Sequence, residues 1–256
     1  SLATLANIRY RGDFFRDELL TALELIEKGY AERGELRGSW AGAMGHTQFM
    51  PSSYMKYAVD QTGDGHADIW TSTSDAIAST ANYLKSFGWV PGLPWGIEVV
   101  VPEGFDHNLY RASFASFRSA GLRRADGGPL PSSGEARLFY PAGHTGPALL
   151  LTANFDVIKK YNSSDAYALA VGHLGDRIVG RPALQGEWPV KAPRLDMNGV
   201  TDLQRRLKRL GLYSHDADGR IGTGTRDAVR QYQQRAGLLA DGWPTPALLA
   251  RMKAAR

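Results

Sequence analysis

Apolar residues recur at helical spacing in two segments near the start of the chain, residues 13–29 and residues 75–86. In the first segment we expect Asp13 to cap the helix and Gly29 to end it in a left-handed conformation. The predicted buried faces consist of Phe15, Leu19, Leu23 and Ile26 in the first helix and Ile77, Ala81 and Leu84 in the second. The pattern therefore predicts a helical beginning for the fold.

From about residue 95 to residue 151, helical spacing gives way to short runs that are typical of strands. The candidate strands are residues 97–101, 136–140 and 148–151. Stretches rich in glycine, proline and serine separate them, as turns require. Because helical spacing returns between Phe155 and Val179, we interpret residues 95–151 as a small β-rich insertion in a helical domain.

The last quarter of the chain predicts a separate three-helix domain, residues 194–256, behind a proline-containing linker, residues 183–193. The first of these helices carries the apolar stripe Val200, Leu203, Leu207 and Leu210, and Gly211 follows it. We expect Thr225 to cap the second helix and Thr245, followed by a proline, to cap the third. The predicted fold is therefore mainly α, with a helical domain over residues 1–182 and this small domain after it.

Composition narrows the class of protein without naming its chemistry. The chain has 43% hydrophobic and 22% charged residues, which is ordinary for a globular protein. No apolar run approaches the ~20 residues that span a bilayer, and the opening lacks a signal-peptide pattern. Cysteine is absent, which excludes disulfides and thiolate metal sites.

Basic residues are concentrated in the tail, where residues 194–256 hold 12 lysines and arginines against 6 aspartates. Such a tail can indicate nucleic acid binding. The basic residues Arg205, Arg206, Lys208 and Arg209, however, alternate with the apolar positions of a helix, as on a solvated face. We therefore expect no nucleic acid partner, while an anionic polymer such as a cell wall remains compatible with the charge.

The most informative segment is residues 38–54, which read GSWAGAMGHTQFMPSSY. Its glycines and alanines leave little side chain to pack, so the backbone must approach something closely. Ser39 and Gln48 are polar residues among apolar neighbours and need hydrogen-bond partners. A sugar polymer could supply those partners, and a tight packing turn between helices is an equally good explanation of these features.

Together with residues 1–6, 57–60 and 81–83, this segment resembles the membrane-bound lytic transglycosylase B family over residues 1 to about 182. The tail, with Asp218-Gly219, Thr225 and Asp241-Gly242, resembles the three-helix peptidoglycan-binding domain. The resemblance implies a lysozyme-like fold and cleavage of the β-1,4 bond between N-acetylmuramic acid and N-acetylglucosamine, leaving a 1,6-anhydromuramoyl end. It implies peptidoglycan glycan strands as partner, a periplasmic or cell-envelope location, a monomer and no required cofactor. It leaves a membrane anchor undecided.

The resemblance also implies which side chains line the substrate cleft. They are Ser39 and Gln48 beside the catalytic carboxyl, Tyr83 facing the sugars, a second cluster of Tyr161, Asn162 and Tyr167, and Arg11 from an N-terminal arginine pair. Tyrosine suits this task because its ring covers the apolar face of a sugar while its hydroxyl takes a hydrogen bond.

In this family a single glutamate acts as acid and base, and it lies upstream of the segment that matches residues 1–6. No residue of this sequence matches that glutamate. We therefore expect the glutamate to lie upstream of Ser1, in an N-terminal segment that has been lost. We expect the chain without it to be inactive. Glu18, Glu24 and Glu27 alternate with basic residues in the first predicted helix, which is typical of a solvated face and not of a substitute acid. A non-catalytic peptidoglycan-binding or scaffold protein is the alternative function.

Residues 60–66 match the first half of an EF-hand loop. The side chains of Asp60, Thr62 and Asp64 occupy positions 1, 3 and 5, glycine occupies position 6, and the carbonyl of His66 is available at position 7. Position 12 is Thr71, where a glutamate is expected. The family closes a shortened loop with an aspartate, here Asp75. We expect weak Ca²⁺ binding, with a metal-free loop of Asx turns as the alternative.

Overall fold

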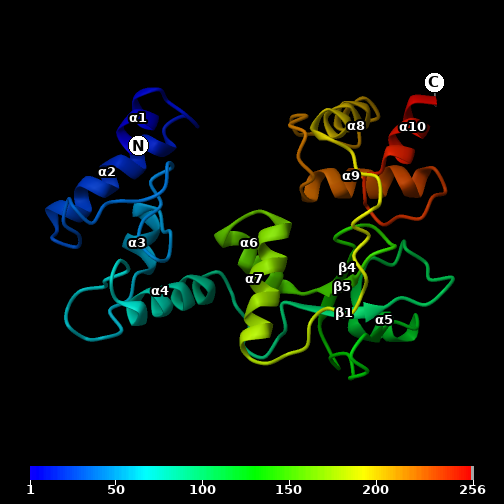
Figure 1. Ribbon diagram of the computed structural model, residues 1–256, viewed down its shortest axis with the longest axis horizontal. Helices are drawn as coiled ribbons and strands as arrows, with labels where there is room; N and C mark the ends of the chain where they lie inside the picture. The colour runs from blue at the N-terminus through cyan, green and yellow to red at the C-terminus, as the bar shows by residue number, and fades with distance from the viewer. Residues whose placement is uncertain (255–256) are drawn as a thin grey trace. The chain divides into compact units, whose positions relative to one another are not determined.

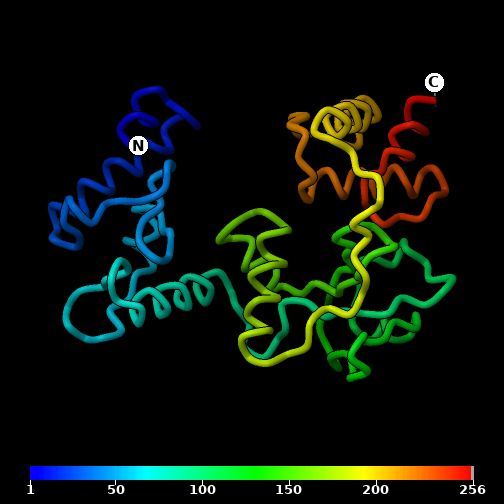
Figure 2. Tube along the Cα trace, in the orientation of Figure 1, coloured from blue at the N-terminus to red at the C-terminus, as the bar shows by residue number. Residues whose placement is uncertain are grey.

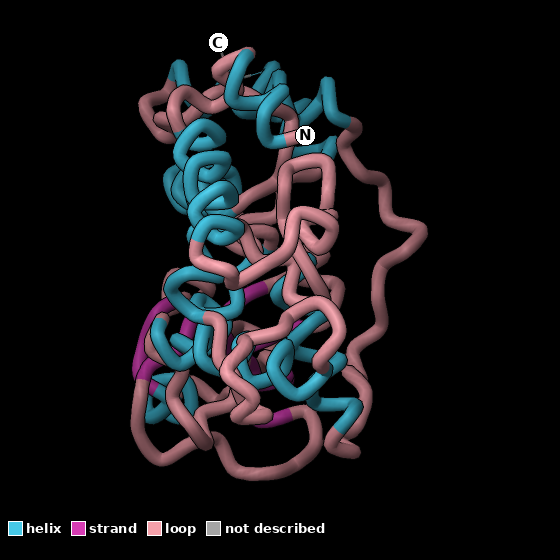
Figure 3. Tube along the Cα trace, turned by 90° about the vertical axis from the view of Figure 1, so that its left-hand side faces the viewer, coloured by secondary structure: helices cyan, strands magenta, loops and turns pink. Residues whose placement is uncertain are grey.

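The computed structural model describes residues 1–254, which divide into two compact units, one ending at Trp89 and the other beginning at Val90. The first unit contains the helices α1 (Leu2–Asn7), α2 (Phe14–Glu27), α3 (Pro51–Tyr57) and α4 (Thr73–Ser86), coloured blue to cyan in Figure 1. Helices and long loops dominate the described chain, and strands are confined to one small sheet (Figure 3). The prediction of a mainly helical fold with a small β-rich part is confirmed.

Helix α2 corrects the predicted phase of the first apolar face. The buried residues are Phe15, Glu18, Ala22 and Leu25, whereas Leu23 is 55% exposed and Ile26 36% exposed. Asp13 occupies the N-cap position, but its side chain makes no capping hydrogen bond. Gly29 does adopt the expected left-handed conformation, with φ of 70°. The buried face is displaced because it includes a glutamate, which an apolar pattern cannot reveal.

Helix α4 is buried on a face other than the predicted one. Asp75, Ala76, Ser79 and Tyr83 point into the unit, whereas Ile77 is 66% exposed. Ile77, Ala81 and Leu84 line a shallow hollow together with His46 and Thr47 from the preceding loop. The apolar stripe of this helix is therefore a surface feature of its own unit.

A five-stranded antiparallel sheet occupies the second unit, in the order β2-β4-β5-β1-β3. The strands are β1 (Gly96–Val100), β2 (Arg111–Ser113), β3 (Arg123–Arg124), β4 (Glu135–Phe139) and β5 (Ala148–Leu151), and α5 (Phe114–Ser119) lies between β2 and β3 in the chain. The central strand β5 is buried at every position, since a strand covered on both faces reads as a continuous apolar run. Phe114 and Phe117 of α5 pack against Leu150 in one core.

Two helices follow the sheet, α6 (Ala153–Tyr161) and α7 (Asp165–Ile178). The ring of Phe155 in α6 lies 6.1 Å from Trp95 and 6.2 Å from Phe139, which anchors this helix to the sheet. Residues 179–196 contain neither helix nor strand, and the chain runs extended through them (Figure 2). Glu98 of β1 holds this segment, because its carboxylate accepts 2.7 Å hydrogen bonds from the amides of Gln185 and Gly186.

The tail folds into α8 (Met197–Arg209), α9 (Thr223–Arg235) and α10 (Pro246–Ala254) around its own core. The amide of Leu248 donates to Thr245 Oγ1 at 3.1 Å, as expected for the third cap. Thr225 is not a cap, since it lies buried inside the first turn of α9 and donates to the carbonyl of Arg220. Leu210, predicted at the end of the buried stripe, is 51% exposed.

Two buried glutamines hold the two Asp-Gly turns of the tail in the same way. Gln204 of α8 donates to Asp218 and accepts from the amide of Gly219. Gln233 of α9 donates to Asp241 and likewise accepts from the amide of the glycine that follows. Each Asp-Gly turn is therefore fixed by a glutamine from the preceding helix.

Candidate substrate-binding site

The glycine-rich segment 38–54 folds into a tight double turn followed by α3. Isolated antiparallel bridges pair Met44 with Gly38 on one side and with Phe49 on the other. Ser39 organises the first turn, because its Oγ accepts hydrogen bonds from the amides of Ala41 at 3.3 Å and Ala43 at 3.2 Å. The partners that this polar side chain needs are therefore supplied by its own loop.

The glycines of this segment are required by contacts inside the first unit. A Cβ on Gly38 would lie 2.0 Å from the carbonyl oxygen of Ala43. A Cβ on Gly45, whose φ is 61°, would lie 2.6 Å from the carbonyl oxygen of Ile69. The backbone of this segment thus approaches other backbone atoms of the first unit closely, as the sequence predicted. These contacts make the loop that carries Gln48 rigid.

Gln48 is the exposed, strained residue of the loop. Its φ of 52° lies in the left-handed region, which residues other than glycine seldom adopt. Its Nε2 donates to the carbonyl of Gly45 at 3.0 Å, which fixes the amide plane and leaves the side chain at the surface. Strained and exposed polar residues of this kind are concentrated at binding sites.

Tyr83 lies in an aromatic cluster beneath this loop. Its ring centroid is 5.6 Å from that of Phe49, 4.9 Å from Tyr57 and 4.6 Å from Phe87. The residue is 9% exposed. Burial, with the neighbouring Tyr57 as a smaller cause, raises the pKa of the Tyr83 hydroxyl. The hydroxyl therefore stays protonated and can donate a hydrogen bond at any physiological pH.

Arg11 lies with two aromatic residues on the surface of the first unit. Its guanidinium carbon is 5.5 Å from the ring centroid of Tyr10, and that ring is 6.4 Å from Trp40. Trp40 is 68% exposed, although it is a large apolar residue inside the glycine-rich segment. Sequence reasoning passed over Trp40, and an aromatic residue between glycines in a turn is the signal that could have found it.

Tyr161, Asn162 and Tyr167 belong to the second unit, around the turn between α6 and α7. Asn162 Oδ1 accepts from the amide of Ser164 at 3.0 Å, and Ser164 Oγ accepts from the amide of Tyr167 at 3.3 Å. Asn162 and Tyr167 are exposed, and Tyr161 is partly exposed. The turn thus gathers the three predicted residues of this cluster, and Ser39, Gln48, Tyr83 and Arg11 lie in the other unit.

The loop from Asp60 to Asp75 is held by its own carboxylates. Asp75, fully buried, accepts from the amides of Gln61 at 2.8 Å, Thr62 at 3.2 Å and Asp68 at 3.0 Å. Thr62 Oγ1 donates to Asp60 Oδ1 at 3.2 Å, so both acidic residues converge on Thr62.

Hydrogen bonds from the loop backbone, first that of Gly65, lower the pKa of Asp60. Asp64 Oδ1 accepts from the amide of His66 at 2.9 Å. Within residues 1–254, no three histidine, aspartate or glutamate side chains are already grouped to hold a metal ion. The oxygen donors predicted from the sequence are nevertheless of the type that hard cations prefer.

Glu18 corrects the prediction of a solvated face. It is 4% exposed, and it accepts from the amide of Ser52 at 2.9 Å and from the Ser52 hydroxyl at 2.6 Å. Glu24 does lie at the surface, where it forms an ion pair with Lys28 at 2.7 Å. Glu18 is therefore a structural carboxylate that joins α2 to α3.

The helical unit with its rigid polar loop, the small sheet and the three-helix tail with its own core define a lysozyme-like protein with a peptidoglycan-binding module. The chain belongs to the family described as "Transglycosylase SLT domain", whose model matches residues 1–176. A second family model, "Putative peptidoglycan binding domain", matches residues 196–252.

A curated relative supports this assignment. The chain is 40% identical over 186 residues to the membrane-bound lytic murein transglycosylase B of Escherichia coli (strain K12), over 70% of this chain and 50% of the relative. It thus spans about half the length of this curated relative.

Two solved structures are also similar. SltB3 from Pseudomonas aeruginosa, in complex with NAG-anhNAM-pentapeptide, superposes with a TM-score of 0.88 and 47% identity, over 98% of this chain and 69% of that one. The Escherichia coli lytic transglycosylase Slt35, in complex with calcium, has a TM-score of 0.56 and 37% identity, over 70% of this chain and 57% of that one. Among residues 1–254, every helix falls short of the length and apolar character that a membrane span requires.

Proposed function

We propose that the protein acts in lytic transglycosylation of peptidoglycan in the cell envelope. In that reaction the muramoyl 6-hydroxyl attacks its own anomeric carbon, the β-1,4 glycosidic bond breaks, and the departing oxygen of N-acetylglucosamine takes a proton. The hydroxyl proton is transferred to the same carboxyl that protonated the leaving group, so no water is consumed. The observation that carries the proposal is the similarity, over 98% of the chain, to a structure that holds the anhydromuramoyl product.

The roles of the individual side chains follow from their surroundings. Gln48 offers an exposed amide on a rigid loop, and Ser39 holds the shape of that loop. Tyr83 provides a protonated hydroxyl. In the second unit, Tyr161, Asn162 and Tyr167 offer aromatic and amide groups to sugar rings, and Arg11 in the first unit offers a cation to the lactyl or peptide carboxylates.

For the 256 residues taken alone, we propose binding without cleavage. The buried carboxylates of the described chain are Glu18, Asp75 and Asp241, and each accepts hydrogen bonds from backbone amides. All three therefore fix segments of the fold, whereas a general acid must face the glycosidic oxygen. This observation favours the second candidate function, a non-catalytic peptidoglycan-binding protein, for the chain as given.

Purified sacculi test both functions. The 256-residue chain should sediment with sacculi and release no anhydromuropeptides, as detected by mass spectrometry of the supernatant. Release of anhydromuropeptides would contradict the proposal of binding without cleavage. Failure to sediment would contradict the peptidoglycan-binding function itself.

We propose that three segments of the chain have different functions. Residues 1–182 form the transglycosylase domain, residues 183–193 the linker, and residues 194–256 the domain that retains the protein, as a monomer, on the wall. The hydrogen bonds from the linker amides to Glu98 support a linker that is held in place on the sheet.

We also propose that the loop from Asp60 to Asp75 binds Ca²⁺ weakly. The donors would be the side chains of Asp60, Thr62, Asp64 and Asp75 and the carbonyl of His66. The convergence of two carboxylates on Thr62 supports the site. When bound, the cation would neutralise these carboxylates and brace the loop, and it would take no part in the chemistry of cleavage.

A further inference from the structure

Within the second unit, helix α9 contacts the sheet region through two buried arginines, Arg226 and Arg230, and the guanidinium carbon of Arg230 lies 4.0 Å from the ring centroid of Tyr110. Arg226 is 8% exposed, and its Nη1 and Nη2 donate to the carbonyls of Tyr140 at 2.9 Å and Pro141 at 3.0 Å. Its guanidinium carbon lies 4.7 Å from the ring centroids of both Phe139 and Trp243. The guanidinium is therefore held between an aromatic ring of the sheet and one of its own domain.

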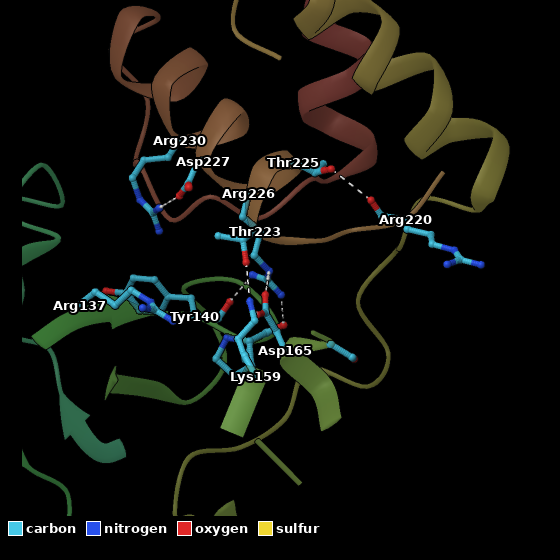
Figure 4. A network of polar contacts seen from close by, with 12 residues as sticks. Arg137, Tyr140, Lys159, Asp165, Arg220, Thr223, Thr225, Arg226, Asp227 and Arg230 are labelled. Atoms are coloured by element: carbon cyan, nitrogen blue, oxygen red, sulfur yellow. Dashed lines mark hydrogen bonds and ion pairs between the residues drawn. The ribbon is translucent and has the colours of Figure 1, made fainter. Parts of the chain in front are cut away.

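The third nitrogen of this guanidinium faces the turn between α6 and α7. Among the described residues, no acceptor lies within hydrogen-bond distance of Arg226 Nε, and Asp165 Oδ2 is 3.8 Å away. The other oxygen of Asp165 accepts from Lys159 Nζ, which also donates to Thr223 Oγ1 of α9 at 2.6 Å (Figure 4). Asp165 thus lies between a cation from α9 and a cation from α6.

Asp165 connects the turn to α9, together with Lys159. It is the first residue of α7, directly after the segment that carries Tyr161 and Asn162. Within the turn, hydrogen bonds involving Asn162 and Ser164 set the local backbone. The ion pairs of Asp165 and the contact between Lys159 and α9 therefore act together with the packing of Phe155 on the sheet to hold the turn.

The contact between Arg226 and the sheet persists at neutral pH and depends on the guanidinium group. Burial lowers the pKa of Arg226 to about 10, which still leaves it charged at pH 7. Removing the side chain would leave the carbonyls of Tyr140 and Pro141 without these donors and Asp165 with one cation fewer. A lysine could not replace it fully, because an ammonium cannot bond both carbonyls while lying flat between two rings.

We propose that Arg226 is a positioning residue, which through Asp165 holds the α6–α7 turn and so fixes the part of the substrate surface formed by Tyr161 and Asn162. The three-helix domain would then shape the binding surface of its neighbour as well as retain the chain on the wall. The inference rests on the proposed function, in which these two residues contact the glycan.

Hydrogen exchange measured by mass spectrometry tests the positioning role without any ligand. In Arg226→Met the amides of residues 159–168 should exchange about tenfold faster than in the parent chain, and in Asp165→Asn several-fold faster. Arg205→Met, a change at an exposed arginine of α8, is the matched control and should leave these amides unchanged. Unchanged exchange in α8 and α10 would show that the three-helix domain remains folded. Parent-like exchange of the turn in both variants would overturn the proposal.

Binding of the soluble fragment NAG-anhNAM-pentapeptide, measured by calorimetry, tests the consequence for substrate. Arg226→Met should weaken the Kd about five- to tenfold, with Arg226→Lys intermediate and Arg205→Met unchanged. If Arg226→Met binds as tightly as the parent although its turn exchanges faster, the positioning role is wrong. If the parent itself does not bind, the proposed function fails, and the exchange comparison still decides whether Arg226 holds the turn.

Discussion

The carboxylate of Glu18 accepts two hydrogen bonds from Ser52, one from its amide at 2.9 Å and one from its hydroxyl at 2.6 Å. Glu18 belongs to α2 and Ser52 to the first turn of α3, so the pair joins two helices that are separate in the sequence. A carboxylate at the start of a helix also interacts favourably with the exposed amides there. The pair therefore supports the end of the glycine-rich loop that presents Gln48.

Replacing Glu18 by glutamine should destabilise the protein by about 1–3 kcal/mol, because a charged acceptor buried beside two donors is lost. Glu27→Gln, at an exposed position of the same helix, should change the free energy of unfolding by less than about 0.5 kcal/mol. Urea unfolding of both variants checks the difference. Equal stabilities would show that the Ser52 contact contributes nothing.

Glu18 also shows why the bounds of the helices could be predicted from the sequence more accurately than the residues on their buried faces. The bounds of α2 and α4 follow from local spacing and from residues such as Gly29, which act within one turn. The buried face of α2 depends on Ser52, a distant residue whose hydrogen bonds make burial of a glutamate possible. An apolar pattern assigns such a glutamate to solvent, and the predicted stripe was displaced for that reason.

Stability should fall at high pH because of Tyr54. Its hydroxyl donates to the carbonyls of Tyr30 and Ala67, and burial raises its pKa from 10.0 to about 12. A pKa raised by folding means that the stabilisation is complete below pH 10 and is lost as pH rises from 10 towards 12, at ~1.4 kcal/mol for each unit of difference. Urea unfolding at pH 8, 10 and 11 should show a decline that Tyr54→Phe reduces. A decline of the same size in the variant would assign it to other groups.

Calcium should stabilise the loop from Asp60 to Asp75 only at high concentration. Ligand stabilisation grows as RT ln(1 + [L]/Kd), so a weak site needs millimolar ion. We expect the Tm of the parent to rise with several millimolar Ca²⁺, and the rise to vanish in Asp64→Ala. Mg²⁺ at the same concentration is the control for ionic strength. If Ca²⁺ raises the Tm of neither the parent nor Asp64→Ala, the calcium site is refuted and the loop is a metal-free series of Asx turns.

The three-helix domain should contribute to retention on the wall through its charge. Residues 194–256 carry 12 basic against 6 acidic residues, and attraction between exposed charges weakens as salt increases. Residues 194–256 expressed alone should sediment with purified sacculi at low salt and less so at about 1 M salt, where the Debye length is near 3 Å. Protein that stays in the supernatant at low salt would refute the assignment of this domain.

Some residues of the candidate site could be predicted from their local sequence, and others acquire their role only in the folded protein. Ser39 and Gln48 could be singled out because a polar residue among glycines is a local signal. Arg226 could not, since its role arises only when Phe139 and Trp243 meet around it, and in the sequence it is one of many basic residues of the tail. Trp40 carries a local signal as well, an aromatic residue among glycines, although only the folded turn shows that it is 68% exposed.

The central claim is that these 256 residues bind the glycan strand of peptidoglycan, and titration calorimetry of the parent chain with NAG-anhNAM-pentapeptide tests it most directly. We expect saturable binding of the fragment to the parent chain, weakened in Gln48→Ala and unchanged in the surface variant Arg205→Met. Absence of any saturable heat at millimolar fragment, with a protein that unfolds cooperatively, would contradict it.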